Sequence, residues 1–190
     1  MRLCKPWSGK VLAWKLPDGQ LRQVEEGSCL LPLALSVQDK FKSPIVEGVF
    51  NGEAVDLQKP LYTDGTVDFI EVNTAEGMRT YTRTLLFMLL AACYKLYPDV
   101  DLEVRNTLGS ALYCLDKSSI KLTPENIKAI EAYMKQMAAA KEPVTLKRFA
   151  KSEAIGKTSR LRTPDSEALL DELPDDATLT VYYLQDMPGY

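Results

Sequence analysis

The residues Gly156-Lys157-Thr158 are of the types that close a phosphate-binding loop, in which backbone N–H groups surround a nucleotide phosphate. The full pattern, G-x-x-x-x-G-K-[ST], needs a glycine five residues before Gly156, where this chain has Lys151. A lysine does not readily adopt the positive φ angles of such a loop. Residues 151–155 instead favour a short helix that ends at Gly156. The sequence therefore predicts no phosphate loop here.

The 190-residue chain contains no histidine. Histidine is the usual general base near neutral pH and the commonest metal ligand, so Ser-His-Asp triads, Cys-His pairs and histidine zinc sites are excluded. Four cysteines are present and form no C-x-x-C motif: Cys4, Cys29, Cys93 and Cys114. Cys114 or Tyr113 as a nucleophile is an alternative, but neither has a histidine to activate it. We expect no catalytic residue, no metal site and no cofactor in this chain.

Charge is distributed unevenly late in the chain. A basic segment spans residues 141–162 and contains Lys141, Lys147, Arg148, Lys151, Lys157, Arg160 and Arg162. An acidic stretch, residues 165–176, follows it. The simpler interpretation is two solvated faces that attract each other across a turn; the functional one is RNA or phosphate binding by Lys147, Arg148 and Lys151. The net charge of −3 argues against attraction of the whole chain to nucleic acid, but not against a local basic patch.

The elements that would position these residues begin with a small sheet. The hydrophobic pattern predicts strands at Val11–Leu16, Gln20–Val24, Ile45–Phe50, Glu53–Leu57 and Thr66–Val72, and a helix at Cys29–Gln38 capped by Ser28. Turn dipeptides separate the strands: Asp18-Gly19, Asn51-Gly52 and Asp64-Gly65. This β-β-α-β-β-β order indicates a ubiquitin-like β-grasp sheet packed on one helix.

A second group of elements follows the short linker expected at Thr74–Gly77. A helix is predicted from Met78 to Tyr97, and its apolar run Leu85–Cys93 is shorter than the ~20 residues of a membrane span, so it is expected in a core. A loop running into a strand is expected at Arg105–Cys114. Thr123 and Pro124 start a helix with the apolar stripe Ile127, Ile130, Met134, Met137 and Ala138. Strands are predicted at Val144–Phe149 and Leu179–Leu184.

These features together resemble the front of threonyl-tRNA synthetases. Residues 10–72 resemble their TGS domain, through Leu16-Pro17-Asp18-Gly19, Val49–Leu57 and Leu61–Gly65. Residues 78–190 resemble the editing domain, through Leu122–Glu131, Pro143 and Ser152–Ile155. The resemblance implies an α+β fold: an N-terminal extension (1–9), a TGS β-grasp domain (10–72), a linker (73–77) and an editing-like domain (78–190) that we expect to be truncated at its C-terminus.

The resemblance does not extend to the catalytic residues of the editing domain. Its H-x-x-x-H motif aligns with Arg83 and Phe87, and its second motif, Cys-x-x-x-His, is expected just after Tyr190. Loss of the histidines and the stretch Arg105–Ser110 are also similar to the N-terminal region of a bacterial uridine kinase or phosphoribulokinase-like family. There a kinase domain using ATP and Mg²⁺ follows, which would make the parent protein an ATP-dependent nucleoside kinase.

The resemblance implies a non-catalytic, cytoplasmic ligand-recognition or regulatory region of such a kinase-like protein. Its inherited cleft would bind a small anionic ligand or nucleotide through Arg83, Arg105, Tyr113 and Lys117. A simpler role for Arg83 is an ion pair with an acid such as Glu103. The alternative function is a stand-alone adaptor that binds tRNA or the ribosome through the TGS and editing-like domains.

Overall fold

The computed structural model describes residues 9–109, 111–157, 168, 170–184 and 187–189. Two compact units, residues 1–84 and 85–190, make up the chain, and each is described by itself. Helix α2 (Ala75–Leu96) gives its first turns to the first unit and the rest to the second. The domain limits expected from the sequence stay a prediction.

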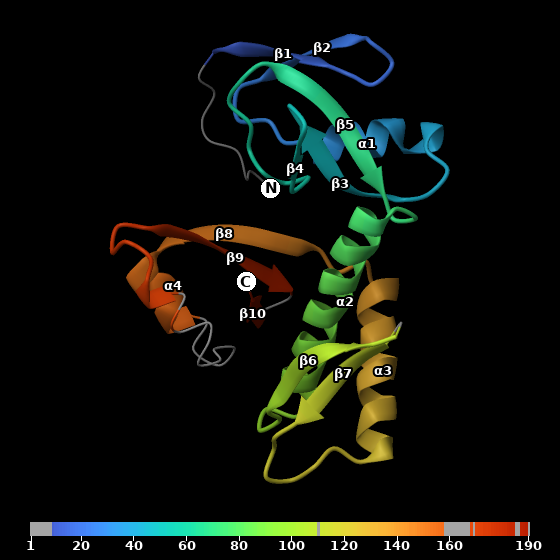
Figure 1. The fold of residues 1–190 in the computed structure, drawn as a ribbon, viewed down its shortest axis with the longest axis vertical. Helices are drawn as coiled ribbons and strands as arrows, with labels where there is room; N and C mark the ends of the chain where they lie inside the picture. The colour runs from blue at the N-terminus through green and yellow to red at the C-terminus, as the bar shows by residue number, and fades with distance from the viewer. Residues whose placement is uncertain (1–8, 110, 158–167, 169, 185–186, 190) are drawn as a thin grey trace. The chain divides into compact units, whose positions relative to one another are not determined.

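The first unit is a mixed five-stranded sheet with one helix against it (Figure 1). Its elements are β1 (Val11–Lys15), β2 (Leu21–Glu25), α1 (Leu31–Val37), the 3-10 turn η1 (Gln38–Lys40), β3 (Ile45–Phe50), β4 (Glu53–Val55) and β5 (Gly65–Glu71). The strand order is β2-β1-β5-β3-β4, and the central pair β1 and β5 is parallel. This is the expected β-grasp arrangement.

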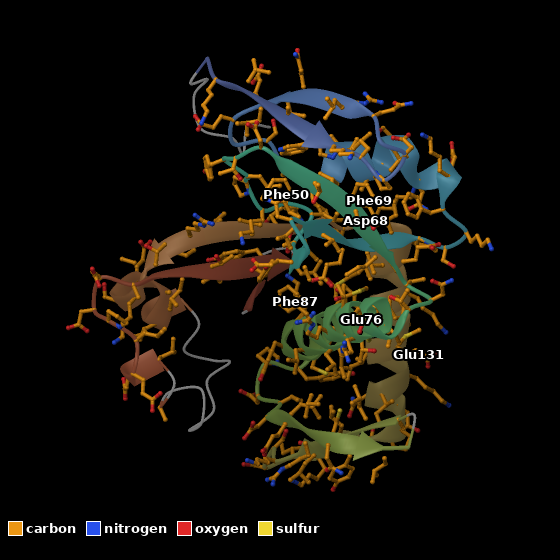
Figure 2. The ribbon with its side chains drawn as sticks, turned by 45° about the horizontal axis from the view of Figure 1, so that its top comes forward. Phe50, Asp68, Phe69, Glu76, Phe87 and Glu131 are labelled. Atoms are coloured by element: carbon orange, nitrogen blue, oxygen red, sulfur yellow. The ribbon has the colours of Figure 1, made fainter. Side chains whose placement is uncertain are left out.

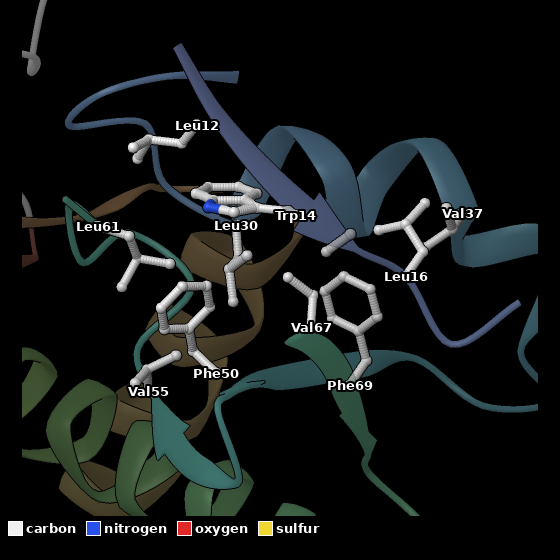
Figure 3. Packing of buried hydrophobic residues seen from close by; sticks show 11 residues of the cluster. Leu12, Trp14, Leu16, Leu30, Val37, Phe50, Val55, Leu61, Val67 and Phe69 are labelled. Carbon is white, nitrogen blue, oxygen red and sulfur yellow. The ribbon is translucent and has the colours of Figure 1, made fainter. Parts of the chain in front are cut away.

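Alternation along the strands builds the core of this unit, shown in Figure 3. Strand β1 buries Leu12 and Trp14 and exposes the residues between them, while β5 buries Val67 and Phe69. Leu30, Ala34 and Val37 come from the α1 segment to close the same cluster. Phe50, labelled in Figures 2 and 3, packs edge-to-face on Trp14 with 5.9 Å between the ring centroids.

In the first unit, one predicted hairpin turn is confirmed and one predicted helix cap is wrong. Asn51 and Gly52 both have positive φ, 53° and 84°, as a two-residue hairpin turn requires, so this prediction is confirmed. The predicted cap at Ser28 is wrong, because α1 begins at Leu31 after an N-cap at Leu30 that has no side-chain bond. Ser28 is engaged in the connection instead: its carbonyl accepts from the Leu61 N–H and its N–H donates to the Glu25 carbonyl.

The predicted linker is helical, because α2 already begins at Ala75. The Thr74 hydroxyl accepts from the Gly77 N–H at 3.0 Å, the bond of an N-cap residue. Farther along α2, Ala91, Ala92 and Cys93 are buried as expected, whereas Leu85 is exposed. No helix in the described part of the chain is long and apolar enough to cross a membrane.

The second unit combines helices with two separate antiparallel sheets. Its elements after α2 are β6 (Leu102–Leu108), β7 (Ala111–Asp116), α3 (Pro124–Ala139), β8 (Val144–Ala150), α4 (Lys151–Lys157), β9 (Thr178–Leu184) and β10 (Met187–Gly189). Ala91 and Cys93 of α2 pack with Ile130 and Met137 of α3, and Leu184 joins them from β9. Both units are therefore α+β (Figure 1), as predicted.

Three finer predictions concern the second unit: the cap of α3, its apolar stripe, and the loop at Arg105. Thr123 caps α3 as predicted, in a reciprocal capping box with Asn126. Of the predicted stripe, Ile130 and Met137 are buried, but Ile127 is 56% exposed and Ala138 is also exposed. The loop expected at Arg105 is wrong: that residue lies in β6, which pairs with β7 around a turn where Gly109 has φ 63°.

Candidate functional site

Arg83 lies on an exposed turn of α2 and contacts a hydroxyl. Its Nη2 donates to the Thr80 Oγ1 at 3.1 Å, and that hydroxyl in turn donates to the Glu47 carboxylate at 2.7 Å. The relay ties the start of α2 to strand β3. Phe87, the second position aligned with the family's histidines, is half-buried against the core cluster of the second unit. Neither side chain supplies a general base.

The β6–β7 hairpin brings two other predicted ligand-binding residues together. Arg105 and Lys117 both pair with Glu103; the Arg105 Nε lies 3.0 Å from the carboxylate and the Lys117 ammonium is in direct contact with it. The Lys117 hydrogen bond, with the charges of Arg105 and Lys117, lowers the pKa of Glu103. Two cations facing one carboxylate leave a local excess of one positive charge.

Tyr113 belongs to the same hairpin, where it pairs with Asn106. The ladder shifts register between Val104 and Asn106, so Arg105 is the bulged residue. Tyr113 is 43% exposed. Arg105, Tyr113 and Lys117 are thus on one hairpin of the second unit, while Arg83 belongs to the first. Sequence reasoning named Glu103 only as a partner for Arg83; the structure gives that carboxylate to Arg105 and Lys117.

Strand β8 carries two of the three residues predicted to contact RNA. Lys147 and Arg148 are both exposed. Because successive strand residues point to opposite faces, they lie on the two faces of the sheet. Strand order is β10-β9-β8, which makes β8 an edge strand. Among the described residues, neither Lys147 nor Arg148 takes part in an ion pair.

Lys151 differs from these neighbours, because it is only 9% exposed. Its ammonium donates to the Leu173 carbonyl at 2.7 Å and lies 3.4 Å from the Asp175 carboxylate. A buried, hydrogen-bonded lysine cannot offer its charge to a phosphate at the surface. The expectation that Lys151 contacts RNA is therefore corrected by its burial, while its pairing with Asp175 fits the predicted attraction between the basic and acidic stretches.

The residues singled out for chemistry elsewhere have structural surroundings. Gly156 lies inside α4, so the GKT tripeptide does not follow a strand-loop-helix path; Thr158 is outside the described residues. Cys93 is buried, and this burial, reinforced by Cys114 and Asp116, raises the pKa of its thiol to about 11. Cys114 is half-buried on β7. The described residues contain no cluster of three or more potential metal ligands.

Comparison with known proteins extends over most of the chain. This chain is 27% identical over 166 residues to threonine–tRNA ligase 1 of Bacillus subtilis. The aligned region covers 87% of this chain and 26% of the ligase. The chain is 29% identical over 175 residues to the threonine–tRNA ligase of Caldanaerobacter subterraneus, covering 91% of this chain and 27% of that protein. No protein-family model matches the chain.

A third relative, the threonine–tRNA ligase of Syntrophomonas wolfei, is 26% identical over 172 residues, covering 90% of this chain and 27% of the ligase. The chain thus spans about a quarter of the length of these curated relatives. Their similarity supports the TGS-like and editing-like regions expected from the sequence. Together with the observed sheets and helices, it confirms the predicted fold class: a β-grasp unit followed by an editing-like α+β unit.

Proposed function

We propose that this chain is a tRNA-binding region that recognises tRNA without hydrolysing an attached amino acid from it. The observation that carries the proposal is similarity to threonine–tRNA ligases over 87% of the chain, in a sequence with no histidine. The similarity supports a tRNA-related role. The absence of histidine removes the usual base for hydrolysis, and shape and polar contacts are sufficient for binding alone.

The exposed cations of β8 are the proposed contacts for the RNA backbone. Lys147 and Arg148 project from an edge strand, and no described acid neutralises either of them through an ion pair. This matters because the chain as a whole is negative, at −3, so binding must depend on a local patch. The two charges on opposite faces of one strand suit a backbone that passes along the edge of the sheet.

The test is a titration of labelled tRNA at low and moderate salt with three proteins. These are the unmodified chain, the double variant Lys147→Gln/Arg148→Gln, and the matched control Lys95→Gln/Lys128→Gln, which removes two exposed lysines from α2 and α3. Each lost phosphate contact should reduce the slope of log K against log salt by about one, so the first variant should lose about two and the control none.

Three results would each overturn a part of the proposal. Absence of salt-sensitive tRNA binding at micromolar protein would remove the RNA-binding function. Release of amino acid from mischarged tRNA at a rate well above that of a buffer blank would contradict the non-catalytic part. Equal loss of affinity in the β8 variant and in its control would reassign binding away from β8.

A second candidate is a regulatory region of a uridine kinase or phosphoribulokinase-like protein. Its support is that Arg105 and Lys117 both pair with the Glu103 carboxylate, next to the hairpin strand that carries Tyr113. The relatives described above are threonine–tRNA ligases, so the tRNA-binding proposal fits them better. Under this second candidate, ATP and Mg²⁺ would bind to a kinase domain outside residues 1–190. A reading frame without G-x-x-x-x-G-K-[ST] beyond residue 190 would eliminate this candidate.

A further inference from the structure

The β8–β9 pair places a cation and two aromatic rings on one face. Residues directly opposite in an antiparallel pair point to the same side of the sheet. Thr145 pairs with Tyr183, Lys147 with Val181 and Phe149 with Leu179. Lys147, Phe149 and Tyr183 therefore share a face, and we refer to these three residues as the cation–aromatic cluster. Arg148 lies on the other face.

Contacts within the cation–aromatic cluster hold the tyrosine ring in place. The Lys147 ammonium lies 4.8 Å from the centre of the Tyr183 ring, within the range of a cation–π contact. Phe149 packs on the same tyrosine with ring centroids 6.4 Å apart and planes inclined by 62°. Val181, which pairs with Lys147 across the two strands, is fully buried, so the sheet at this cluster is well packed. Tyr183 is thus pre-organised while remaining partly exposed.

Within the part of the chain that the structure describes, no acid forms an ion pair with the lysine of this cluster. Every ion pair among the described residues uses other cations: Lys10, Lys40, Arg79, Arg105, Lys117, Lys135 and Lys151. A lysine that only protects an edge strand from aggregation needs no aromatic partner. A positive charge beside a fixed aromatic ring is the combination that binds single-stranded nucleic acid, because the ring stacks a base and the cation attracts its phosphate.

We propose that the cation–aromatic cluster binds one unpaired nucleotide of an RNA. The base stacks on the exposed part of Tyr183, and the phosphate contacts the Lys147 ammonium. A paired base is a poor ligand, because in an RNA duplex its faces are covered by the neighbouring pairs and its major groove is too narrow for side chains. This inference rests on the proposed function for its choice of RNA as the partner.

The experiment compares two RNA probes with the full chain. One is an unstructured decanucleotide with a central 2-aminopurine, and the other is a hairpin with the same number of phosphates and the 2-aminopurine in its stem. Stacking on Tyr183 should change the fluorescence of the single-stranded probe. Tyr183→Leu should weaken its binding about tenfold, which is the size of one lost base–aromatic stack, and leave hairpin binding unchanged.

Further variants separate stacking from folding and from charge. Tyr183→Phe keeps the ring and should bind within about twofold of the unmodified chain, whereas Lys147→Gln should weaken binding of the single strand and reduce its salt slope by about one. Tyr81→Leu, at an exposed tyrosine of α2, is the matched control and should have no effect. Thermal unfolding of each variant reports on folding.

Several results would overturn the cluster as a nucleotide site. One is that the unmodified chain binds the single strand no better than the hairpin. The others are that Tyr183→Leu leaves the affinity for the single strand unchanged, or that it weakens binding of both probes equally. The outcome is separable from that of the tRNA titration. Loss of tRNA binding only in the Lys147/Arg148 double variant, with Tyr183→Leu unaffected, would end this inference alone. Tyr183-dependent binding of the decanucleotide without any tRNA binding would end the proposed function alone.

Discussion

The Lys151 ammonium donates a hydrogen bond to the carbonyl oxygen of Leu173 at 2.7 Å. This bond joins the start of α4 to a residue 22 positions later, in the acidic stretch. Ala177 adds a backbone bond, because its carbonyl accepts from the Lys151 N–H at 2.9 Å. Lys151 therefore stabilises the fold of the second unit by linking α4 to the segment before β9, although the sequence analysis grouped it with the exposed cations of β8.

The first prediction is that Lys151→Met lowers stability without affecting RNA binding. Methionine keeps the apolar stem but leaves the Leu173 carbonyl without its charged donor, at a cost of about 1–3 kcal/mol in the free energy of unfolding. Urea unfolding measures the loss, and tRNA titration of the folded variant should match the unmodified chain. Lys147→Met is the control: it should weaken RNA binding and leave the free energy of unfolding nearly unchanged. Reduced RNA affinity with unchanged stability in Lys151→Met would contradict the buried role.

The second prediction concerns Gly77, at the start of α2. A Cβ atom there would overlap the backbone carbonyl of Glu71, which cannot move as a side-chain end can. Gly77→Ala should therefore lower the free energy of unfolding by about 1–3 kcal/mol or more, although alanine is normally the better helix former.

Gly156 in α4 provides the matched control, because an added Cβ would have no atom within 4 Å. Gly156→Ala should stabilise the protein by about 0.5–1 kcal/mol, as is usual in a helix. Thermal melts of the two variants should shift in opposite directions. A destabilised Gly156→Ala would contradict the helical and uncrowded surroundings of this glycine.

The third prediction is a pH dependence centred on Asp116. Its carboxylate accepts hydrogen bonds from the Ser118 hydroxyl, the Leu122 N–H and the Ser118 N–H, and these lower its pKa from 3.8 to about 2. Because the folded value is depressed, the stabilisation is complete above pH 3.8 and is lost as pH falls through about 2. The carboxylate organises the connection between β7 and α3.

Asp116→Asn should therefore be less stable than the unmodified chain at neutral pH, with the difference shrinking as the pH falls from 3.8 towards 2. Urea midpoints across a pH series measure it. Asp99→Asn, at an exposed loop position, should track the unmodified chain throughout. A stability difference for Asp116→Asn that stays constant across the series would show that this carboxylate is not the titrating group.

The fourth prediction concerns the charge balance of the β6–β7 hairpin. Glu103→Gln frees Arg105 and Lys117 from their shared carboxylate and should change the free energy of unfolding only slightly, because both cations are exposed to solvent. If the hairpin contacts RNA or another polyanion, affinity at low salt should rise about twofold to threefold and the gain should fade at high salt.

Glu131→Gln makes the same change of charge elsewhere. Glu131 pairs with Lys135 on an exposed side of α3, and Figure 2 labels it there. It should leave binding unaltered if the hairpin is a specific contact. Equal gains in the two variants, measured by titration with labelled tRNA, would instead attribute the effect to net charge and remove the hairpin from the interface.

Local signals in the sequence determined most of the secondary structure. The Asn51-Gly52 turn, the Thr123 cap and the alternation of Val67 and Phe69 each act over a few residues, and the structure contains all three. The absence of histidine likewise needs no coordinates, since it limits the chemistry of the chain whatever its fold.

Tertiary contacts decided the rest, because they depend on residues far apart in the chain. Nothing near Lys151 in the sequence indicates that the Leu173 carbonyl will accept a hydrogen bond from its ammonium, and nothing near Lys147 indicates that its ammonium will lie over the Tyr183 ring. The run Arg105–Leu108 is polar enough to read as a loop, and only pairing with β7 makes it a strand. The sequence by itself thus determined the fold class and which chemistry is excluded. The register of β8 against β9 and the burial of one lysine decided which cations remain available, since those depend on which distant segments pack together.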